Sequence, residues 1–302
     1  MTQRFSAARA LVLAAWLLSG CTLPGLTEPT PFAFPTPNLT HTALFQPAPS
    51  ETPEPAALPT ATPEVEPSPT SPAAPSGPTA TFAPLTSRPN GTPVAAAFMA
   101  SAPTIDGDLA EWTTASYAVD QIVFGAANWT GVADLSGSFH IGWDEANLYV
   151  GVRVRDDRHV QISTGRFLYR GDAVEIQLDA DLPGDYHVAA LNADDYQLGL
   201  SPGNFGSLPP EAYLWYPAAL EGARPGVTVA ARQASDGYTL EARIPWSVFG
   251  VTPAAGKTFG FALSLSDNDQ AGSALQQSMV SSVATRRLTN PATWGTLVLG
   301  GP

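Results

Sequence analysis

The sequence predicts an all-β fold: an antiparallel, jelly-roll-like β-sandwich over residues 94–302 that follows a disordered tether rich in proline and threonine. Three observations support this prediction. Apolar and polar side chains alternate in many short runs, turn-forming residues separate the runs, and no amphipathic run beyond short turns reaches helical length. A block of roughly 200 residues can bury one hydrophobic core between two packed sheets.

The predicted strands follow one another along this block. Apolar residues alternate with polar ones at residues 139–143, 148–154, 174–178, 238–244 and 261–265. Turn-forming sequences lie at 144–147, 181–185, 235–237 and 267–269. Because every second side chain of a run is apolar, one face of each strand is expected to pack against the opposite sheet. Four tryptophans are predicted to pack in the core or at its edge: Trp112, Trp143, Trp246 and Trp294.

The polar positions of three of these strands are predicted to line one side of a sheet. They are Glu175, Gln177, Glu241, Arg243, Ser264 and Ser266. A concave polar face flanked by aromatic rings suits a sugar, because its hydroxyls need donors and acceptors and a pyranose ring packs on a flat ring. The same alternation is typical of a solvated outer face, so both interpretations stay open.

The first 20 residues predict a lipoprotein signal peptide. Arg4 and Arg9 precede an apolar run at 10–18 that is too short to span a bilayer. The sequence Leu18-Ser19-Gly20-Cys21 resembles the lipobox of bacterial lipoproteins, and this implies a lipid on Cys21, the only cysteine. We therefore expect an extracytoplasmic lipoprotein, anchored in the membrane at the cell surface. An ordinary secretory signal with a chance cysteine is the alternative.

Residues 21–93 predict a disordered linker. Of the 30 prolines of the chain, 19 lie between residues 22 and 93, among threonine, alanine and serine. Proline lacks an amide donor and fixes φ, so we expect a solvated, polyproline-II-biased tether that carries the domain away from the membrane.

The charge of the chain limits its partners. A formal net charge of −13 argues against nucleic acid and against electrostatic docking to anionic lipid. Catalysis would need a nucleophile with a base, or two carboxylates in one cleft. Glu175 and Glu241 could form such a pair, which leaves a glycoside hydrolase open as a minor alternative to a non-catalytic binding protein.

Several short motifs follow one another in an order that resembles that of a known family of domains. They are Ile105-Asp106-Gly107-Asp108-Leu109 with Trp112, the runs at 143–150, 171–179 and 237–246, and the closing Trp294-Gly295-Thr296-Leu297. Together they resemble the family 9 carbohydrate-binding modules and the related DOMON-like β-sandwich domains, over nearly all of residues 94–299. The resemblance implies a jelly-roll-like sandwich, non-catalytic binding of a polysaccharide or oligosaccharide, and often bound calcium.

The resemblance also implies a sugar site, of which the chain keeps a part. Tyr169 stands where the family has the first of two clamping tryptophans, and Leu288 where it has the second. Glu175 matches the glutamate that hydrogen-bonds sugar, and Gln197 stands in place of an arginine. Trp215 is our candidate for a substitute aromatic platform.

Two further features complete the expected site. Gln177 shares the polar face of its strand with the matched glutamate. Aspartates gather in turns at 156–157, 179–185, 194–195 and 267–269, which suits a structural calcium ion whose ligands the sequence does not assign. Aspartate is also a common turn residue without a metal. The spacing of His140, His159 and His187 does not suit zinc.

Two other functions remain as alternatives. Because Leu288 offers no flat ring, the domain could be a surface interaction or adhesion module that kept the fold and lost sugar binding. Some related sandwiches bind haem between a methionine and a histidine, for which Met99 and Met279 are the only candidates after the signal peptide.

Overall fold

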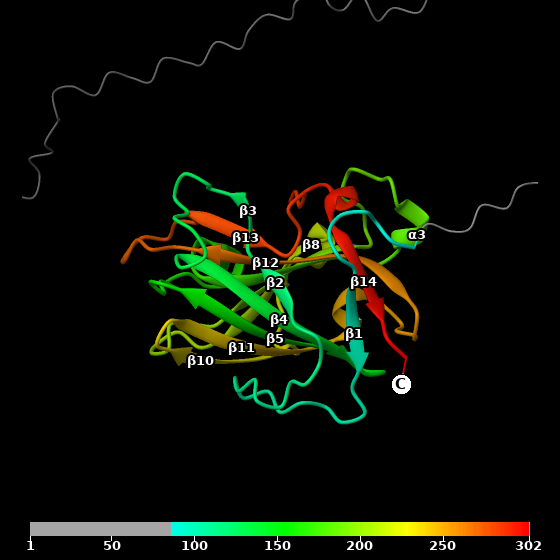
Figure 1. Cartoon of the computed structure of the whole chain (residues 1–302), viewed down its shortest axis with the longest axis horizontal. Helices are drawn as coiled ribbons and strands as arrows, with labels where there is room; N and C mark the ends of the chain where they lie inside the picture. Colours follow the sequence, from blue (N-terminus) through cyan, green and yellow to red (C-terminus); the bar gives the residue numbers. More distant parts are fainter. Residues whose placement is uncertain (1–85, 302) are drawn as a thin grey trace, which may run out of the picture. The chain divides into compact units, whose positions relative to one another are not determined.

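The computed structural model describes residues 86–301 (Figure 1). The predicted signal peptide, the lipidation site at Cys21 and most of the predicted linker lie outside the described residues. Within them, the all-β prediction is confirmed. None of the helices in this part of the chain is long and apolar enough to cross a membrane.

Fourteen strands and a few single-turn helices make up the described fold. The strands are β1 (Val94–Phe98), β2 (Tyr117–Val119), β3 (Gln121–Phe124), β4 (Leu135–Trp143), β5 (Asn147–Asp156), β6 (Ala173–Asp179), β7 (Asp195–Ser201), β8 (Glu211–Tyr216), β9 (Gly222–Ala223), β10 (Thr228–Ala234), β11 (Gly237–Pro245), β12 (Thr258–Asp267), β13 (Ser278–Ser281) and β14 (Gly295–Leu299). The short helices are η2 (Gly165–Arg170), α3 (Leu182–Asp185), η3 (Ala218–Leu220), η4 (Trp246–Phe249) and η5 (Pro291–Thr293).

The strands form two layers that pack face to face (Figure 1). One layer, here the β6 sheet, runs β14-β12-β6-β7-β8-β9, with β13 and β3 beside the end of β12. The other, here the β5 sheet, runs β10-β11-β5-β4, with β2 also on β4. The pairs are antiparallel except at β1, which pairs in parallel with β14 through residues 94–96 and with β4 through residues 97–98. Strand β1 therefore joins the two sheets.

The core lies between the apolar faces of the two sheets. Phe139 of β4 and Phe261 of β12 contact each other there, with ring centroids 6.0 Å apart. Val152, Ile176 and Leu240 are fully buried in the same cluster. All four predicted core tryptophans are buried, which confirms their assignment to the core and its edges.

The prediction that six polar side chains share one face is wrong for two of them. Glu175 lies on β6 and faces Ser264 of β12 across the β6 sheet. Glu241 and Arg243 lie on β11, which pairs with β5 in the other sheet. Alternation shows which side chains of one strand share a face, but it does not show which sheet the strand joins.

Residues just before β1 pack on the domain, although the sequence assigns them to the linker. Arg88 is only 2% exposed, and its guanidinium lies 2.8 Å from the carboxylate of Asp179. Its backbone N–H donates to the Thr296 hydroxyl at 2.8 Å. A buried charge of this kind requires its partner carboxylate, so these residues belong to the fold rather than to the tether.

Candidate functional site

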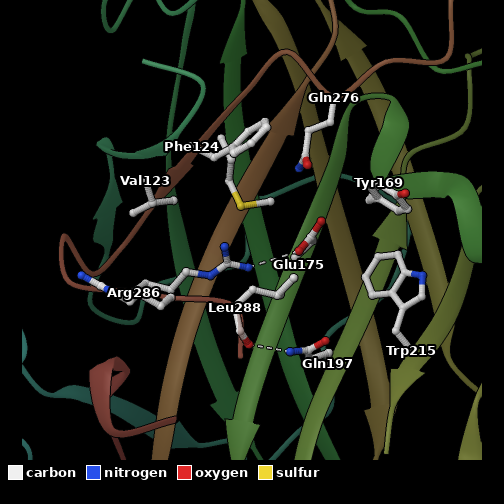
Figure 2. A pocket seen from close by; sticks show the side chains of 11 residues that line it. Val123, Phe124, Tyr169, Glu175, Gln197, Trp215, Gln276, Arg286 and Leu288 are labelled. Atoms are coloured by element: carbon white, nitrogen blue, oxygen red, sulfur yellow. Dashed lines mark hydrogen bonds and ion pairs between the residues drawn. The ribbon is translucent and has the colours of Figure 1, made fainter. Parts of the chain in front are cut away.

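A cavity of about 600 Å³ opens on the outer face of the β6 sheet (Figure 2). Its lining comes from strands, from helix η2 and from the segment after β13. The lining residues are Val123, Phe124, Tyr169, Glu175, Gln197, Trp215, Gln276, Met279, Arg286, Arg287 and Leu288. Four of the five predicted binding residues therefore line one cavity, and so does the leucine at the position of the second clamp.

The strand period places the polar side chains in this cavity. Because alternate residues of β6 face opposite sides, Val174 and Ile176 enter the core while Glu175 points outward. Gln197 lies on β7 and Trp215 on β8, the next two strands of the sheet. Three consecutive strands thus contribute a carboxylate, an amide and an indole to one surface.

Trp215 lies across the neighbouring strand because that strand has a glycine there. A Cβ on Gly199 would come within 2.3 Å of the Trp215 ring. The Trp215 Nε1–H donates to the Arg166 carbonyl at 2.9 Å, which fixes the ring, and the ring stays partly exposed. Tyr169 lies beside it, with centroids 6.0 Å apart and planes at 76°. The two rings form an aromatic corner rather than a parallel clamp.

Glu175 is a buried carboxylate with one side open to the cavity. Its oxygens accept from the Ser266 hydroxyl at 3.1 Å and from Arg286 at 3.4 Å. Burial raises the pKa of Glu175, and the nearby Arg286 charge opposes that rise. Burial likewise lowers the pKa of Arg286, which the carboxylate opposes. The pair is a charge-balanced polar centre that can accept from and donate to sugar hydroxyls.

The sequence does not point to Arg286. It follows β13 in a segment without strand alternation, and only the fold brings it over β6. A pair of adjacent arginines, Arg286-Arg287, is the only local signal, and it does not indicate which of the two is buried. Phe124, on β3, is missed for the same reason, because its approach to the cavity depends on the pairing of β3 with β13.

Two predicted binding residues, Gln177 and Gln197, hydrogen-bond to other residues of the site and hold them in place. Gln177 is fully buried and does not line the cavity; its carbonyl oxygen accepts from Arg286 Nε at 3.4 Å. The structure thus places Gln177 as a support for the arginine. Gln197 lines the cavity and also donates from Nε2 to the Leu288 carbonyl at 2.6 Å. That bond holds Leu288 at the rim, where the side chain is 45% exposed.

The arrangement favours binding over catalysis. Among residues 86–301, Glu175 is the only one that brings a carboxylate to the cavity lining. Glu241, the second member of the glycosidase pair considered from the sequence, lies on the outer face of the other sheet, where three donors hold it. Hydrolysis by two carboxylates needs both on either side of one glycosidic bond. The pair predicted for that reaction is therefore not formed.

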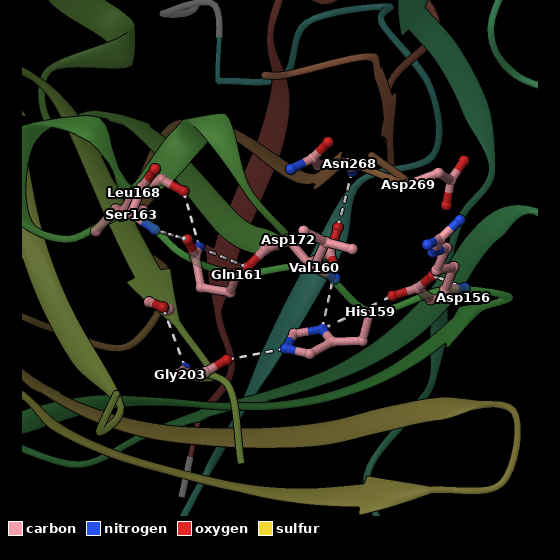
Figure 3. Close-up of polar contacts among 12 residues, drawn as sticks. Asp156, His159, Val160, Gln161, Ser163, Leu168, Asp172, Gly203, Asn268 and Asp269 are labelled. Atoms are coloured by element: carbon pink, nitrogen blue, oxygen red, sulfur yellow. Dashed lines mark hydrogen bonds and ion pairs between the residues drawn. The ribbon is translucent and has the colours of Figure 1, made fainter. Parts of the chain in front are cut away.

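A second polar region lies at the turn after β12 (Figure 3). Carboxylate oxygens of Asp156, Asp267 and Asp269 lie within 4.8 Å of one another, and Asp134 and Asp157 gather with Asp269 in the same way. Buried oxygens of Asp156, Asp267 and Asp269 have no hydrogen-bond partner among the described residues. Burial raises the pKa of Asp267 to about 7 and that of Asp269 to about 6. An all-oxygen donor set with unpartnered carboxylates fits calcium.

Beside these aspartates, His159 forms a closed network of its own (Figure 3). Its Nδ1 lies 3.0 Å from Asp172, and its Nε2 lies 2.9 Å from the Gly203 carbonyl. Burial opposes the imidazolium charge, but the negative charges of Asp156 and Asp172 beside the ring outweigh burial and raise the pKa of His159 to about 10. A protonated imidazole whose nitrogens both donate is not a metal ligand. His159 instead provides a positive charge beside the aspartates.

The stretch Gly199-Leu200-Ser201-Pro202-Gly203 contains the spacing Gly-x-Ser-x-Gly of a hydrolase nucleophile. Ser201 is 1% exposed at the end of β7, and its hydroxyl accepts from the Gly203 N–H at 3.1 Å. The strand continues into a turn rather than a helix. The serine therefore stabilises a turn and does not form a nucleophile elbow.

The haem alternative has little support at this cavity. Met279 lines it, but none of the described histidines does. His159 is held in its own network, away from the lining residues. A methionine–histidine pair for haem iron is therefore not formed there.

A family model described as carbohydrate family 9 binding domain-like matches residues 105–302. A family 9 carbohydrate-binding module from Caldicellulosiruptor kristjanssonii in complex with cellotriose is similar in structure, with 21% identity over 70% of this chain and 95% of that chain and a TM-score of 0.54. A module of the same family and organism in complex with glucose gives 21% identity over 70% and 97%, and a TM-score of 0.53. No curated protein matches the chain. At this identity the structural likeness shows the fold.

Proposed function

Because the chain belongs to the family of carbohydrate family 9 binding domain-like proteins, we propose that it binds an oligosaccharide in the cavity of the β6 sheet. The family is one of non-catalytic binding domains, so the protein is a binding protein rather than an enzyme. One observation carries the location: Tyr169, Glu175, Gln197 and Trp215, which come from four separate elements, meet in one cavity.

The chemistry of these groups supports the proposal. Trp215 offers a partly exposed indole on which the apolar face of a pyranose can pack, and Tyr169 stands at its edge. Glu175 and Gln197 offer acceptors and a donor at the base of that aromatic corner. Two structural neighbours hold cellotriose and glucose, so β-linked gluco-oligosaccharides are the first ligands to test.

The test is calorimetric titration of the full chain with glucose and with cello-, xylo- and manno-oligosaccharides. If the full chain is kept in solution with a detergent, that detergent should have no sugar headgroup, because such a headgroup could compete for the site. We expect Trp215→Ala to lower the affinity by about thirtyfold, since a stacked aromatic anchor contributes roughly 2 kcal/mol. Phe167→Ala is the matched control, because this half-exposed ring lies on the helix of Tyr169 but does not line the cavity. Equal affinity of wild type and Trp215→Ala would contradict the site.

A surface interaction module without sugar binding is the second candidate. The exposed Leu288 favours it, because this side chain lies at the rim where a flat ring would complete a clamp. This candidate predicts that no saccharide in the panel binds to a protein that unfolds cooperatively on heating. Binding of any oligosaccharide that depends on Trp215 rejects it.

For the position in the cell, we propose a lipid anchor at Cys21, with the domain displayed outside the cytoplasm on the proline-rich tether. The lipobox sequence and the composition of residues 21–93 support this proposal. We expect the mature chain to begin at Cys21 and to gain the mass of its acyl chains, as intact-mass spectrometry would show. Cys21→Ser should remove both the added mass and the partition into detergent. A mature protein cleaved elsewhere would contradict the anchor.

We also propose a structural calcium ion held by Asp156, Asp267 and Asp269, with Asp134 and Asp157 beside them. Calcium at a hundred times its dissociation constant should stabilise the fold by about 2.7 kcal/mol, and chelator should reverse the gain. Thermal unfolding measures both.

Asp267→Asn should abolish this calcium-dependent gain. The control Asp108→Asn, at an exposed position outside the cluster, should keep it. An unfolding temperature that calcium and chelator leave unchanged would reject the site.

A further inference from the structure

The cavity of the β6 sheet has two unlike sides (Figure 2). Tyr169 and Trp215 stand on one side, and Glu175 lies in the middle with the guanidinium of Arg286. The opposite side and the rim carry four apolar side chains, with the polar Gln276 and Arg287 beside them. We call this part the apolar wall; it consists of Val123, Phe124, Met279 and Leu288.

The apolar wall is unusual because much of it is open to water. The side chain of Phe124 is 51% exposed and that of Leu288 45%, although both are large and apolar. Met279 is almost fully buried behind them. A cluster of exposed apolar side chains inside a cavity is typical of a binding surface.

The fold holds the apolar wall in place without a ligand. Phe124 pairs with Met279 in the register of β3 and β13. The next residue, Gly125, has a φ of 67°, and a Cβ there would meet the Gln277 carbonyl oxygen at 2.0 Å. Asn128 donates to the same carbonyl at 2.9 Å. The loop after β3 is therefore fixed against β13, and little ordering would be needed when a ligand binds.

Sugar hydroxyls are poorly matched to this wall. A hydroxyl pressed against Phe124, Val123 or Leu288 would lose water and find no donor or acceptor on these side chains. Leaving a buried polar group unpaired costs about 1–3 kcal/mol. A group without hydroxyls would instead gain free energy from the apolar area that it covers.

We propose that the ligand is a sugar that carries an apolar group, such as an aromatic aglycone, an acyl ester or a methyl ether. The sugar ring lies at the aromatic corner of Tyr169 and Trp215, and the apolar group covers Phe124 and its neighbours. This inference rests on the proposed sugar site and adds the class of sugar that it selects.

Two matched glucosides test the inference. Methyl β-D-glucopyranoside and phenyl β-D-glucopyranoside share the ring and the anomeric configuration and differ in the aglycone. By calorimetry on the full chain, we expect the phenyl glucoside to bind about tenfold more tightly, as burial of roughly 60 Å² of additional apolar surface predicts. Equal affinities for the two glucosides would overturn the inference and leave the proposed sugar site intact.

Variants test whether the apolar wall causes the preference for the phenyl glucoside. Phe124→Ala should remove the preference for the phenyl glucoside, so that the ratio of the two affinities falls from about ten to about one. Leu220→Ala, which truncates a similarly exposed apolar side chain on η3 outside the cavity, should keep the preference. A preference that survives in Phe124→Ala would overturn the assignment of the wall. If neither glucoside and no saccharide of the panel binds to the folded protein, the proposed function fails, and the inference fails with it.

Discussion

Both sheets carry the same small motif on their outer face: a buried glutamate directly opposite a glycine, with a tryptophan lying across that glycine. In the β5 sheet, Glu241 faces Gly151, and a Cβ on Gly151 would come within 2.7 Å of the Trp112 ring. The Trp112 Nε1–H donates to Glu241 at 2.7 Å. The backbone N–H groups of Asp106 and Gly107 donate to its second oxygen at 3.0 and 2.7 Å.

In the β6 sheet the same motif is left open. Glu175 faces Gly199, and the ring of Trp215 crosses this glycine. Here the indole N–H donates to the Arg166 carbonyl, away from the glutamate. The carboxylate keeps a 3.1 Å hydrogen bond from Ser266 and a longer one from an arginine.

The difference lies in what covers each glutamate. The loop at 104–112 closes over Glu241 and provides three donors, so that this carboxylate fastens the loop to the sheet. Over Glu175 there is a cavity instead. The same local motif therefore fastens a loop on one sheet and faces the cavity of the proposed sugar site on the other, and the difference is what covers the sheet.

The largest expected effect is a loss of stability at the covered glutamate. Glu241→Gln replaces one acceptor oxygen with an amide that cannot accept, so at least one of three donors is left buried and unpaired. We expect the free energy of unfolding to fall by about 3 kcal/mol, since removing one partner of a buried charged hydrogen bond has a cost of this size. Urea unfolding measures it.

Glu175→Gln is the matched control on the open motif. It should also lower the unfolding free energy, because it leaves the buried Arg286 without its partner charge. We expect a smaller loss than in Glu241→Gln, since the Glu175 carboxylate accepts one short hydrogen bond and one of 3.4 Å and is open to the cavity on one side. The substitution should lower the sugar affinity as well. If both substitutions destabilise the fold equally, the distinction between a structural and a binding glutamate is wrong.

The sequence predicts the two outward-facing glutamates but neither the motifs around them nor the contrast between these motifs. Alternation identifies Glu175 and Glu241 as outward-facing, because a side chain's face follows from its position along the strand. It cannot assign the strands to sheets, since β6 and β11 differ only in the partners that the fold gives them. Nor can it show that the loop carrying Trp112 lies over Glu241, a contact between residues 129 positions apart.

Some residues of the candidate site could likewise be predicted from the sequence, and others could not. Tyr169, Glu175, Gln197 and Trp215 could be found from strand pattern and resemblance, and the structure places them together. Arg286 could not, because it lies in an irregular segment whose path over β6 depends on long-range contacts.

Gly199 and Gly151 occupy equivalent positions in the two motifs. Gly199→Ala should push the Trp215 ring off the sheet, because the new Cβ would lie 2.3 Å from it. Since the aromatic corner depends on that ring, we expect sugar affinity to fall by about tenfold, with a stability loss of roughly 1–2 kcal/mol. Gly151→Ala should meet Trp112 at 2.7 Å and reduce stability by a similar amount.

The two glycine variants should differ in their affinity for sugar. Gly151→Ala should leave sugar binding unchanged, because Trp112 lies on the other sheet. Calorimetric titration of both variants, together with their unfolding curves, separates the two effects. A tenfold loss of affinity in Gly151→Ala would mean that the two sheet faces are coupled.

The smallest expected effect is a dependence of sugar affinity on pH at the open glutamate. Burial raises the pKa of Glu175 above its ordinary value, while Arg286 opposes the rise. Sugar hydroxyls that donate to this side chain need the carboxylate, so affinity should fall as the pH is lowered through the raised pKa. We expect the loss, as the pH falls from above the raised pKa to the ordinary pKa of a glutamate, to be smaller than that in Gly199→Ala.

Stability should respond to the same proton with the opposite sign. The folded protein holds the Glu175 proton more tightly than the unfolded chain, so ionising it destabilises the fold as the pH rises from the unfolded pKa to the folded one. Asp172, Asp267 and His159 also have shifted pKa values, so the wild-type curve contains their titrations too. The difference between wild type and Glu175→Gln isolates the one group. If that difference shows no pH dependence in either affinity or unfolding free energy, Glu175 carries the same charge throughout this range, and the open motif is as fixed as the covered one.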